Sequence, residues 1–231
     1  MRGARPERAL DAAVRAAMRD AEAGRILVAC SGGPDSVALA SVLMRLQREP
    51  AERLVVGHVN HGRRAGSDQD ECVALAVASR LGLPFAVAHP HIERDDEQTL
   101  RDARYAALEQ LARAHRCSVV VTAHTAEDQT ETVLLALFRG TGLTGLGGIR
   151  RCRPLAEGIA LVRPLLRVTH AELAVELCRN GLPYARDPTN AERRYRRNAL
   201  RATLESLRAD FPHLDRAVAR CAAIAADKAD R

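Results

Sequence analysis

The stretch Ser31–Ser36, SGGPDS, holds residue types suited to binding phosphate. It follows the apolar run Ile26–Cys30 and precedes a helical pattern, so it places unpaired backbone N–H groups at a helix N-terminus, which is an anion site. Two glycines permit positive φ and close backbone approach, two serines offer hydroxyl donors, and a proline stiffens the turn. The stretch lacks the lysine of a Walker A loop and the spacing of a dinucleotide fingerprint. A plain strand-to-helix turn is the structural alternative.

Three carboxylates extend this chemistry. Asp35 within the turn would repel phosphates unless a divalent cation lay between them, which implies Mg²⁺. Asp128 and Glu131 are spaced i, i+3 at the start of a helical pattern, so both point to one face. Carboxylates there can pair with an ammonium group and take its proton. Acidic residues in a first helical turn are also ordinary partners of the helix dipole, and this alternative stays open.

The elements that must position these groups alternate along the chain. Four apolar runs of strand length each lead through a loop into a helical pattern. The expected strands are Ile26–Cys30, Leu54–Val59, Phe85–Ala88 and Ser118–Ala123, and the expected helices are Ser36–Arg48, Asp68–Leu81, Leu100–His115 and Glu127–Phe138. This order predicts an α/β fold with a doubly wound parallel sheet. Ligands bind at the carboxyl ends of such strands, so the turn, His58 and His124 should share one site.

The flanking segments are less regular. A leading helix is expected over Ala9–Ala23, capped by Gly24. Beyond Arg139 the chain is glycine-rich and then basic, with a short strand at Ile159–Val162. A helix begins with a capping box at Thr169 and Glu172 and stops at Gly181. An alanine-rich C-terminal helix or pair of helices follows, so we expect a catalytic domain over residues 1–208 and a short helical extension over 209–231.

Charge is distributed unevenly over the 231 residues. The net charge is +6, made up of −2 for residues 1–138 and +8 for residues 139–231, and all but one of the 35 basic residues are arginine. Such asymmetry favours a polyanion lying across the C-terminal part, because phosphate contacts supply most nucleic-acid affinity. A compositional bias toward arginine is the alternative. Few aromatics, 3%, argue against extensive base stacking.

Other functional classes receive little support. The six cysteines are scattered without any Cys-x-x-Cys, which argues against a zinc knuckle or an iron–sulfur cluster. The histidine pairs His58/His61 and His89/His91 lack partners at metal-ligand spacing. The N-terminus lacks the apolar block of a signal peptide and no run is long enough to span a membrane, so we expect a cytoplasmic protein with no membrane partner.

SGGPDS after a strand resembles the pyrophosphate-binding loop of the N-type ATP pyrophosphatases, which cleave ATP between the α- and β-phosphates to adenylate a substrate. Further motifs, covering Ile26 to Arg201 in order, resemble the tRNA(Ile)-lysidine synthetase family. They are HVNHGRR at 58–64, RDARYAAL at 101–108, TAHTAEDQTETVLLALFRGTGLTGL at 122–146, RPLL at 163–166 and DPTNAERRYRRNALR at 187–201. Three positions depart from the family pattern: Asn60 and Glu127, where Asp is common, and Thr125, where His is common.

The resemblance implies a two-step reaction with ATP, L-lysine and isoleucine tRNA. The 2-position oxygen of the wobble cytidine attacks the α-phosphate and releases pyrophosphate; the ε-amine of lysine then displaces AMP and leaves lysidine. By resemblance the catalytic residues are Asp35, Arg104, Asp128 and Glu131, with Asp35 and Asp128 holding Mg²⁺. ATP would bind to Ser31, Gly32, Gly33, Pro34, Asp35, Ser36, His58 and His124. The tRNA would contact Arg139, Arg150, Arg151, Arg193, Arg194, Arg197 and Arg201.

Two alternatives stay open. One is a tRNA thiolase of the same superfamily, making 2-thiocytidine or thiouridine, although such enzymes commonly use paired cysteines or a cluster. The other is a non-catalytic module that binds a nucleotide or RNA with idle carboxylates. Without the resemblance, Arg104 reads as a surface arginine and His124 as a strand-end histidine. The sequence does not decide the oligomeric state, and a homodimer is one open alternative.

Overall fold

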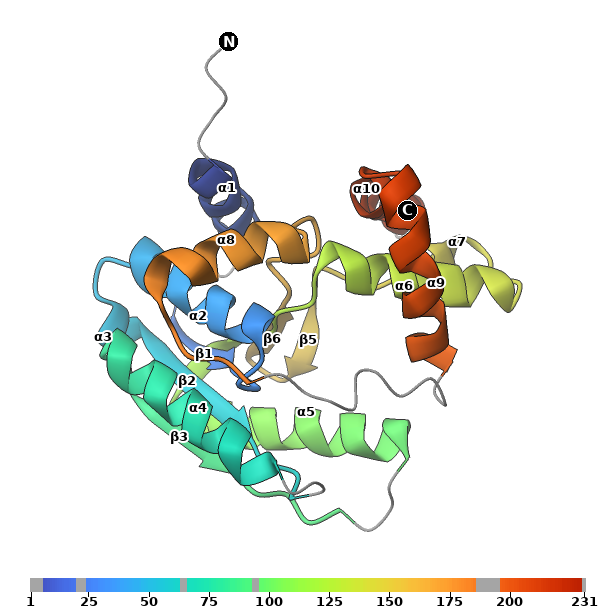
Figure 1. Ribbon diagram of the computed structural model, residues 1–231. Coiled ribbons are helices and arrows are strands. Elements are labelled where there is room, and N and C mark those ends of the chain that lie inside the picture. The colour runs from blue at the N-terminus through green and yellow to red at the C-terminus, as the bar shows by residue number, and fades with distance from the viewer. Residues whose placement is uncertain (1–5, 20–23, 63–65, 93–95, 186–195, 230–231) are drawn as a thin grey trace.

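A six-stranded sheet in the order β3-β2-β1-β4-β6-β5 forms the centre of the molecule (Figure 1). The computed structural model describes residues 6–19, 24–62, 66–92, 96–185 and 196–229. The strands are β1 (Arg25–Ala29), β2 (Leu54–Val59), β3 (Phe85–Ala88), β4 (Cys117–Val121), β5 (Cys152–Ala156) and β6 (Ile159–Val162). All neighbouring pairs are parallel except β5 with β6. The predicted doubly wound α/β fold is confirmed.

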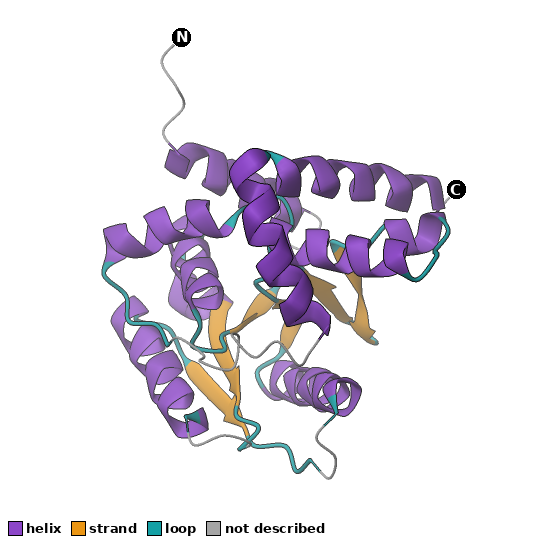
Figure 2. Cartoon of the chain, turned by 45° about the vertical axis from the view of Figure 1, so that its right-hand side comes forward, coloured by secondary structure: helices purple, strands orange, loops and turns teal. Residues whose placement is uncertain are grey.

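Helices cover both faces of the sheet (Figure 2). They are α1 (Pro6–Met18), α2 (Pro34–Leu46), α3 (Pro50–Arg53), α4 (Ser67–Leu81), α5 (Glu97–Ala114), α6 (Ala126–Phe138), α7 (Leu143–Leu146), α8 (His170–Asn180), α9 (Arg196–Asp210) and α10 (Leu214–Ala229). Because strand side chains alternate, Ile26 and Val28 of β1 enter the core with α1, α2, α4 and α8, while Leu27 enters the core with α5. The central strand is therefore buried from both sides.

A helical lobe stands beside the sheet. Helix α10 packs against α6 and α7, and α9 packs against α6. Figure 1 shows these four helices together on the right. The expected division at residue 208 falls inside α9, and it stays a prediction. None of the helices within the described ranges is both long and apolar enough to cross a bilayer.

Several expected elements differ from the observed ones. Helix α1 ends at Met18, so Gly24 is not its cap; with φ +140° it precedes β1, beside Ser118. Strand β5 was missed because it is an edge strand whose residues stay largely accessible, so it lacks an apolar run. The glycine-rich segment contains the one-turn helix α7. The capping box at Thr169 and the left-handed cap at Gly181 are both confirmed.

Candidate active site

The turn Ser31–Ser36 joins β1 to α2 with an uncapped helix N-terminus. Gly32 has φ +84°, and a Cβ atom there would lie 2.9 Å from the carbonyl oxygen of Asp70 in α4. Only glycine fits this close approach. Gly33 is the N-cap of α2, yet no side chain caps the helix, and Pro34 occupies its first turn. The first-turn amides of α2 thus have no side-chain acceptor, which is the arrangement that an anion-binding helix start requires.

The two serines brace the turn from within. The Ser36 hydroxyl donates to the Gly33 carbonyl at 2.9 Å and accepts from the Ser31 amide at 3.2 Å. The Ser31 and Ser36 hydroxyl oxygens are 3.2 Å apart. A further restraint comes from Ala185, whose amide donates to the Gly32 carbonyl at 2.8 Å. The serine hydroxyls predicted to meet phosphate therefore hold the shape of the loop in this structure.

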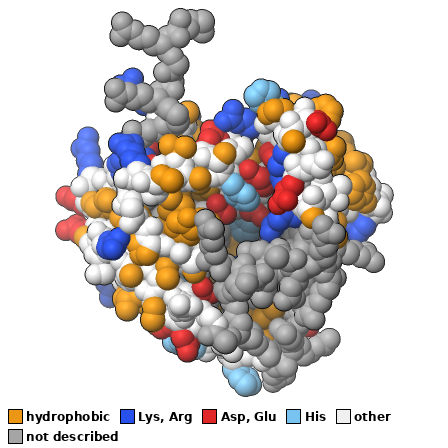
Figure 3. Space-filling model, in the orientation of Figure 1, with side chains coloured by type: hydrophobic (Ala, Val, Ile, Leu, Met, Phe, Trp, Pro, Cys, Tyr) orange, Lys and Arg blue, Asp and Glu red, His pale blue; other side chains and the backbone are white. Residues whose placement is uncertain are grey.

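Two carboxylates from distant parts of the chain meet beside the turn. Asp35 lies in the first turn of α2 and Asp128 in the first turn of α6. His170, at the start of α8, links them: its Nε2 lies 3.4 Å from Asp35 Oδ2 and 3.2 Å from the Thr125 hydroxyl. Thr125 is the N-cap of α6, and its amide donates to Asp128 Oδ2 at 3.0 Å. In Figure 3, acidic side chains gather around a histidine near the centre of this face.

The electrostatics of Asp35 reflect this crowding. The pKa of Asp35 is raised to about 6, chiefly by burial; His170 and Arg201 lower it, and the neighbouring carboxylates Asp128 and Glu127 raise it. The charged form of Asp35 is therefore disfavoured. A bound cation or ammonium group would stabilise the ionised carboxylate.

Glu127 was not among the expected site residues, and neither was His170. The Glu127 side chain is buried; its Oε1 accepts from the His170 amide at 2.9 Å, and its Oε2 is buried without a hydrogen-bond partner. A buried carboxylate oxygen with no donor is costly unless a ligand or ion completes it. The adjacency of Glu127 to Asp128 was the available signal for Glu127. The approach of His170 depends on how α8 packs against α2, which local sequence does not reveal.

The donor set fits Mg²⁺ held together with a nucleotide. Within the described residues no group of three or more His, Cys, Asp or Glu side chains is arranged to hold a metal by itself. Mg²⁺ usually takes one or two protein carboxylates and completes its shell with phosphate oxygens and water. Asp35 and Asp128, beside a turn whose free helix N-terminus suits phosphate, match that pattern and not that of a structural metal.

Glu131 and Arg201, expected to serve different substrates, are paired with each other. Glu131 is 0% exposed, and Arg201 from α9 holds both of its carboxylate oxygens, with Nε 2.7 Å from Oε1 and a terminal nitrogen 3.0 Å from Oε2. This pair joins α9 to α6 next to Asp128. Arg104, the other expected catalytic residue, lies exposed on α5.

The two expected ATP-binding histidines lie at the carboxyl edge of the sheet. His58 is 3% exposed, and its Nδ1 is 2.8 Å from the Cys30 carbonyl oxygen. Burial lowers the pKa of His58, which favours the neutral ring. Through this contact with Cys30, His58 therefore supports the start of the turn. His124 Nδ1 lies 3.0 Å from the Thr122 hydroxyl at the end of β4.

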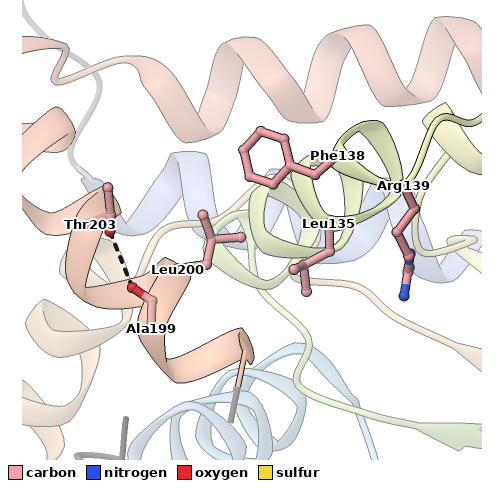
Figure 4. A pocket seen from close by; sticks show the side chains of 6 residues that line it. All are labelled: Leu135, Phe138, Arg139, Ala199, Leu200 and Thr203. Atoms are coloured by element: carbon pink, nitrogen blue, oxygen red, sulfur yellow. Dashed lines mark hydrogen bonds between the residues drawn. The ribbon is translucent and has the colours of Figure 1, made fainter. Parts of the chain in front are cut away.

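The expected tRNA-binding arginines are dispersed. Arg193 and Arg194 lie outside the described residues, as does the side chain of Arg197 in α9. Arg150 donates to the Ala226 carbonyl of α10, and Arg151 donates to the carbonyls of Ala16 and Ala17 in α1. Arg139 borders an open apolar cavity of about 400 Å³ between α6 and α9 (Figure 4). Its other lining residues are Leu135, Phe138, Ala199, Leu200 and Thr203. Among the described residues, none of the carboxylates of the candidate active site lines this cavity.

Comparison with known proteins is consistent with this geometry. A family model described as the PP-loop domain matches residues 6–207. Similar curated proteins include a tRNA(Ile)-lysidine synthase from Gloeobacter violaceus, 41% identical over 78% of this chain and 55% of that protein. Another of the same name, from Synechococcus sp., is 38% identical over 89% of this chain and 64% of that protein. These names match the family indicated by the sequence motifs. The chain spans 55% and 64% of the length of these two relatives.

Solved structures share the fold. A U34-tRNA thiolase from Methanococcus maripaludis, determined with its 4Fe–4S cluster, superimposes with a TM-score of 0.77 at 16% identity, over 94% of this chain and 77% of that one. A glutamine-dependent NAD⁺ synthetase from Acinetobacter baumannii gives a TM-score of 0.51 at 17% identity, over 75% of this chain and 32% of that one. At such low identity these likenesses describe the architecture alone.

Proposed function

Since this chain belongs to the PP-loop domain family, we propose that it uses ATP to activate the wobble cytidine of an isoleucine tRNA with a CAU anticodon and then joins lysine to it. The product is lysidine, and the by-products are pyrophosphate and AMP. One observation carries the proposal: Asp35 and Asp128, far apart in sequence, meet beside an uncapped helix start that suits phosphate.

The turn and the carboxylates have separate roles in the first step of the reaction. The first-turn amides of α2 hold the pyrophosphate end of ATP, where the helix dipole favours negative charge. Asp35 and Asp128 hold Mg²⁺, which supplies charge neutralisation at the reacting phosphates. The cytidine oxygen attacks the α-phosphorus, and the bond to the β-phosphate breaks. Adenylation is required because a ring carbonyl oxygen leaves only after it carries a phosphate.

The acidic site also suits the second step. The lysine ammonium, with an ordinary pKa of about 10.4, must lose a proton before it attacks the activated carbon. Arg201 occupies both oxygens of Glu131, whereas Glu127 Oε2 is buried without a hydrogen-bond partner, so we assign the attraction and deprotonation of the ammonium to Glu127. Arg104 approaches the activated base from α5 in this scheme.

Transfer of radiolabelled lysine tests the proposal. The chain is incubated with ATP, Mg²⁺, labelled lysine and unmodified isoleucine tRNA, and label in the RNA is counted. We expect Asp35→Ala and Asp128→Asn to lower transfer by at least about 100-fold while tRNA affinity stays near that of the original protein. Asp210→Asn, an exposed aspartate at the end of α9, is the matched control and should retain full transfer.

Other outcomes identify the alternatives. Sulfur incorporation without lysine would indicate a thiolase. Tight binding of tRNA and ATP with no transfer, unchanged by either site variant, would indicate a binding module. Either result would overturn the proposed activity.

A further inference from the structure

A cluster of arginines surrounds Tyr105 on α5. The guanidinium carbon of Arg153 lies 5.0 Å from the centre of the Tyr105 ring, and that of Arg101 lies 5.7 Å from it. Arg163 donates a hydrogen bond of 3.3 Å to the Tyr105 hydroxyl. Arg101 and Tyr105 lie on α5, Arg153 lies on β5, and Arg163 directly follows β6. We refer to Arg101, Tyr105, Arg153 and Arg163 as the tyrosine–arginine cluster.

The positive charge of this cluster is not compensated. None of the carboxylates in the described parts of the chain forms an ion pair with Arg101, Arg153 or Arg163. Arg163 is only 2% exposed; it donates to the Arg150 carbonyl at 2.7 Å, but its Nε is buried without a hydrogen-bond partner. A buried cation without an anion is unfavourable, so the site is electrostatically incomplete as it stands.

The ionisation of the central residues reflects the same excess of charge. Burial raises the pKa of Tyr105, but Arg163, Arg101 and Arg104 lower it by more, so the net pKa lies below its ordinary value. Burial lowers the pKa of Arg163; Tyr105 raises it in part, and Arg153 and Arg101 lower it. An anion bound here would favour the protonated form of Arg163.

The chemistry of the cluster matches a phosphodiester. Guanidinium groups present paired donors that fit phosphate oxygens, and stacking on an aromatic ring holds them in a fixed orientation. Arg101 is exposed and Arg153 half-buried, so an extended polyanion can reach both from solvent. A rigid pair of arginines on a tyrosine face positions a strand without reading its sequence.

The location links the cluster to the candidate active site. Arg163 directly follows Val162, whose carbonyl accepts from the amide of Thr122, the residue after β4. The cluster therefore lies at the carboxyl edge of the sheet, one strand from the loop that leads to Asp128. A nucleotide that enters that site from an RNA loop carries phosphodiesters on both sides, within reach of this edge.

We propose that the tyrosine–arginine cluster binds a backbone phosphodiester of the RNA whose base enters the candidate active site. The identity of that RNA as isoleucine tRNA rests on the proposed function, whereas the phosphate site itself does not. The phosphates of ATP are assigned to the turn at Ser31–Ser36, so the cluster is a separate anion site.

Paired charge removals test this assignment. The variant Arg101→Gln/Arg153→Gln is compared with Arg113→Gln/Arg116→Gln, which removes two exposed arginines at the other end of α5, near the opposite edge of the sheet. Arg163 is left in place because it is buried. Affinity for isoleucine tRNA is measured from low to moderate salt without ATP or lysine, and thermal unfolding verifies folding of both variants.

The cluster variant should bind tRNA about 10-fold or more weakly at low salt, and the slope of log affinity against log salt should fall by about 1. The control variant should lose less than about 3-fold, and binding of ATP should be the same in all proteins. Equal losses of tRNA affinity in both variants would mean that the cluster contributes only non-specific surface charge, and this would overturn the proposal. Unchanged tRNA affinity in the cluster variant would overturn it as well. Loss of ATP affinity would assign the cluster to nucleotide phosphates instead and also overturn it.

The same experiment separates this inference from the proposed activity. If the original protein binds tRNA through the cluster but transfers no lysine, the activity is wrong and the phosphate site stands. If lysine is transferred while the cluster variant keeps its tRNA affinity, the activity stands and the phosphate site is wrong.

Discussion

Gly32 shows how the absence of a side chain sets the shape of the turn Ser31–Ser36. Its φ of +84° is unfavourable for any other residue, and a Cβ would meet the backbone of α4. We expect Gly32→Ala to destabilise the fold by about 2–4 kcal/mol, since steric overlap adds to backbone strain. The control is Gly158→Ala, where φ is +72° but no atom lies within 4 Å of the added methyl; there strain alone should cost about 1–2 kcal/mol. Urea unfolding measures both, and equal losses would contradict a role for the contact with Asp70.

Asp35 links the chemistry of the site to the stability of the fold. Its folded pKa of about 6 lies above its ordinary value of 3.8, so the folded protein binds this proton more tightly than the unfolded chain. The stability that Asp35 contributes is therefore fully present below pH 3.8 and is lost as pH rises through 6. At neutral pH the ionised carboxylate opposes folding.

Removing that charge should stabilise the protein even as it removes function. We expect Asp35→Asn to raise the free energy of unfolding by about 1–2 kcal/mol at pH 7.5 without Mg²⁺, and to leave it nearly unchanged at pH 4. Urea titrations at the two pH values measure the difference, with the exposed Asp210→Asn as the control that should show neither effect. A destabilised Asp35→Asn at pH 7.5 would mean that the carboxylate is not crowded as described.

At the scale of elements, the buried pair of Glu131 and Arg201 fastens α9 to α6 beside the site. Removal of one partner leaves a buried charge, so Arg201→Met should cost about 3–5 kcal/mol, whereas Glu131→Gln/Arg201→Met should recover much of that loss. The control is Arg216→Met, which breaks the more exposed pair with Glu172 and should cost less than about 1 kcal/mol. If Arg201→Met weakens tRNA binding but not folding, Arg201 serves RNA and not the joint between helices.

Local patterns predicted some elements well and others poorly. Strands β2, β3 and β6 were expected at their observed residues because each is a short apolar run between turn signals. Strand β5 escaped because Pro154 and accessible side chains at an edge do not form such a run.

Within the site, helical spacing indicated that Asp128 and Glu131 share a face, but it did not indicate what each would meet. Asp128 turns back to the N-cap Thr125, and Glu131 meets an arginine 70 positions later in the chain. His170 joins the site through the packing of α8 on α2. This is a tertiary contact, and no local sequence pattern predicts it. Sequence thus predicted that these carboxylates lie at one edge of the sheet, and packing decided which partner each of them meets.

For the whole molecule, the site lies where the sheet layer meets the helical lobe of α6, α7, α9 and α10. The first turns of α2 and α6 belong to the two sides of this junction, and α8 bridges them through His170. On the opposite side of β4, the tyrosine–arginine cluster offers uncompensated positive charge along the same edge. The molecule therefore places an acidic candidate site beside a basic cluster on the same edge of the sheet.

The fate of the ATP phosphates tests the central claim most directly. With ATP labelled separately at the α- and γ-phosphates, in the presence of lysine and isoleucine tRNA, we predict labelled AMP from the first and labelled pyrophosphate from the second, both dependent on the tRNA and both absent from Asp35→Ala. Release of ADP and inorganic phosphate would contradict a turn that holds the pyrophosphate end of ATP for attack at the α-phosphorus.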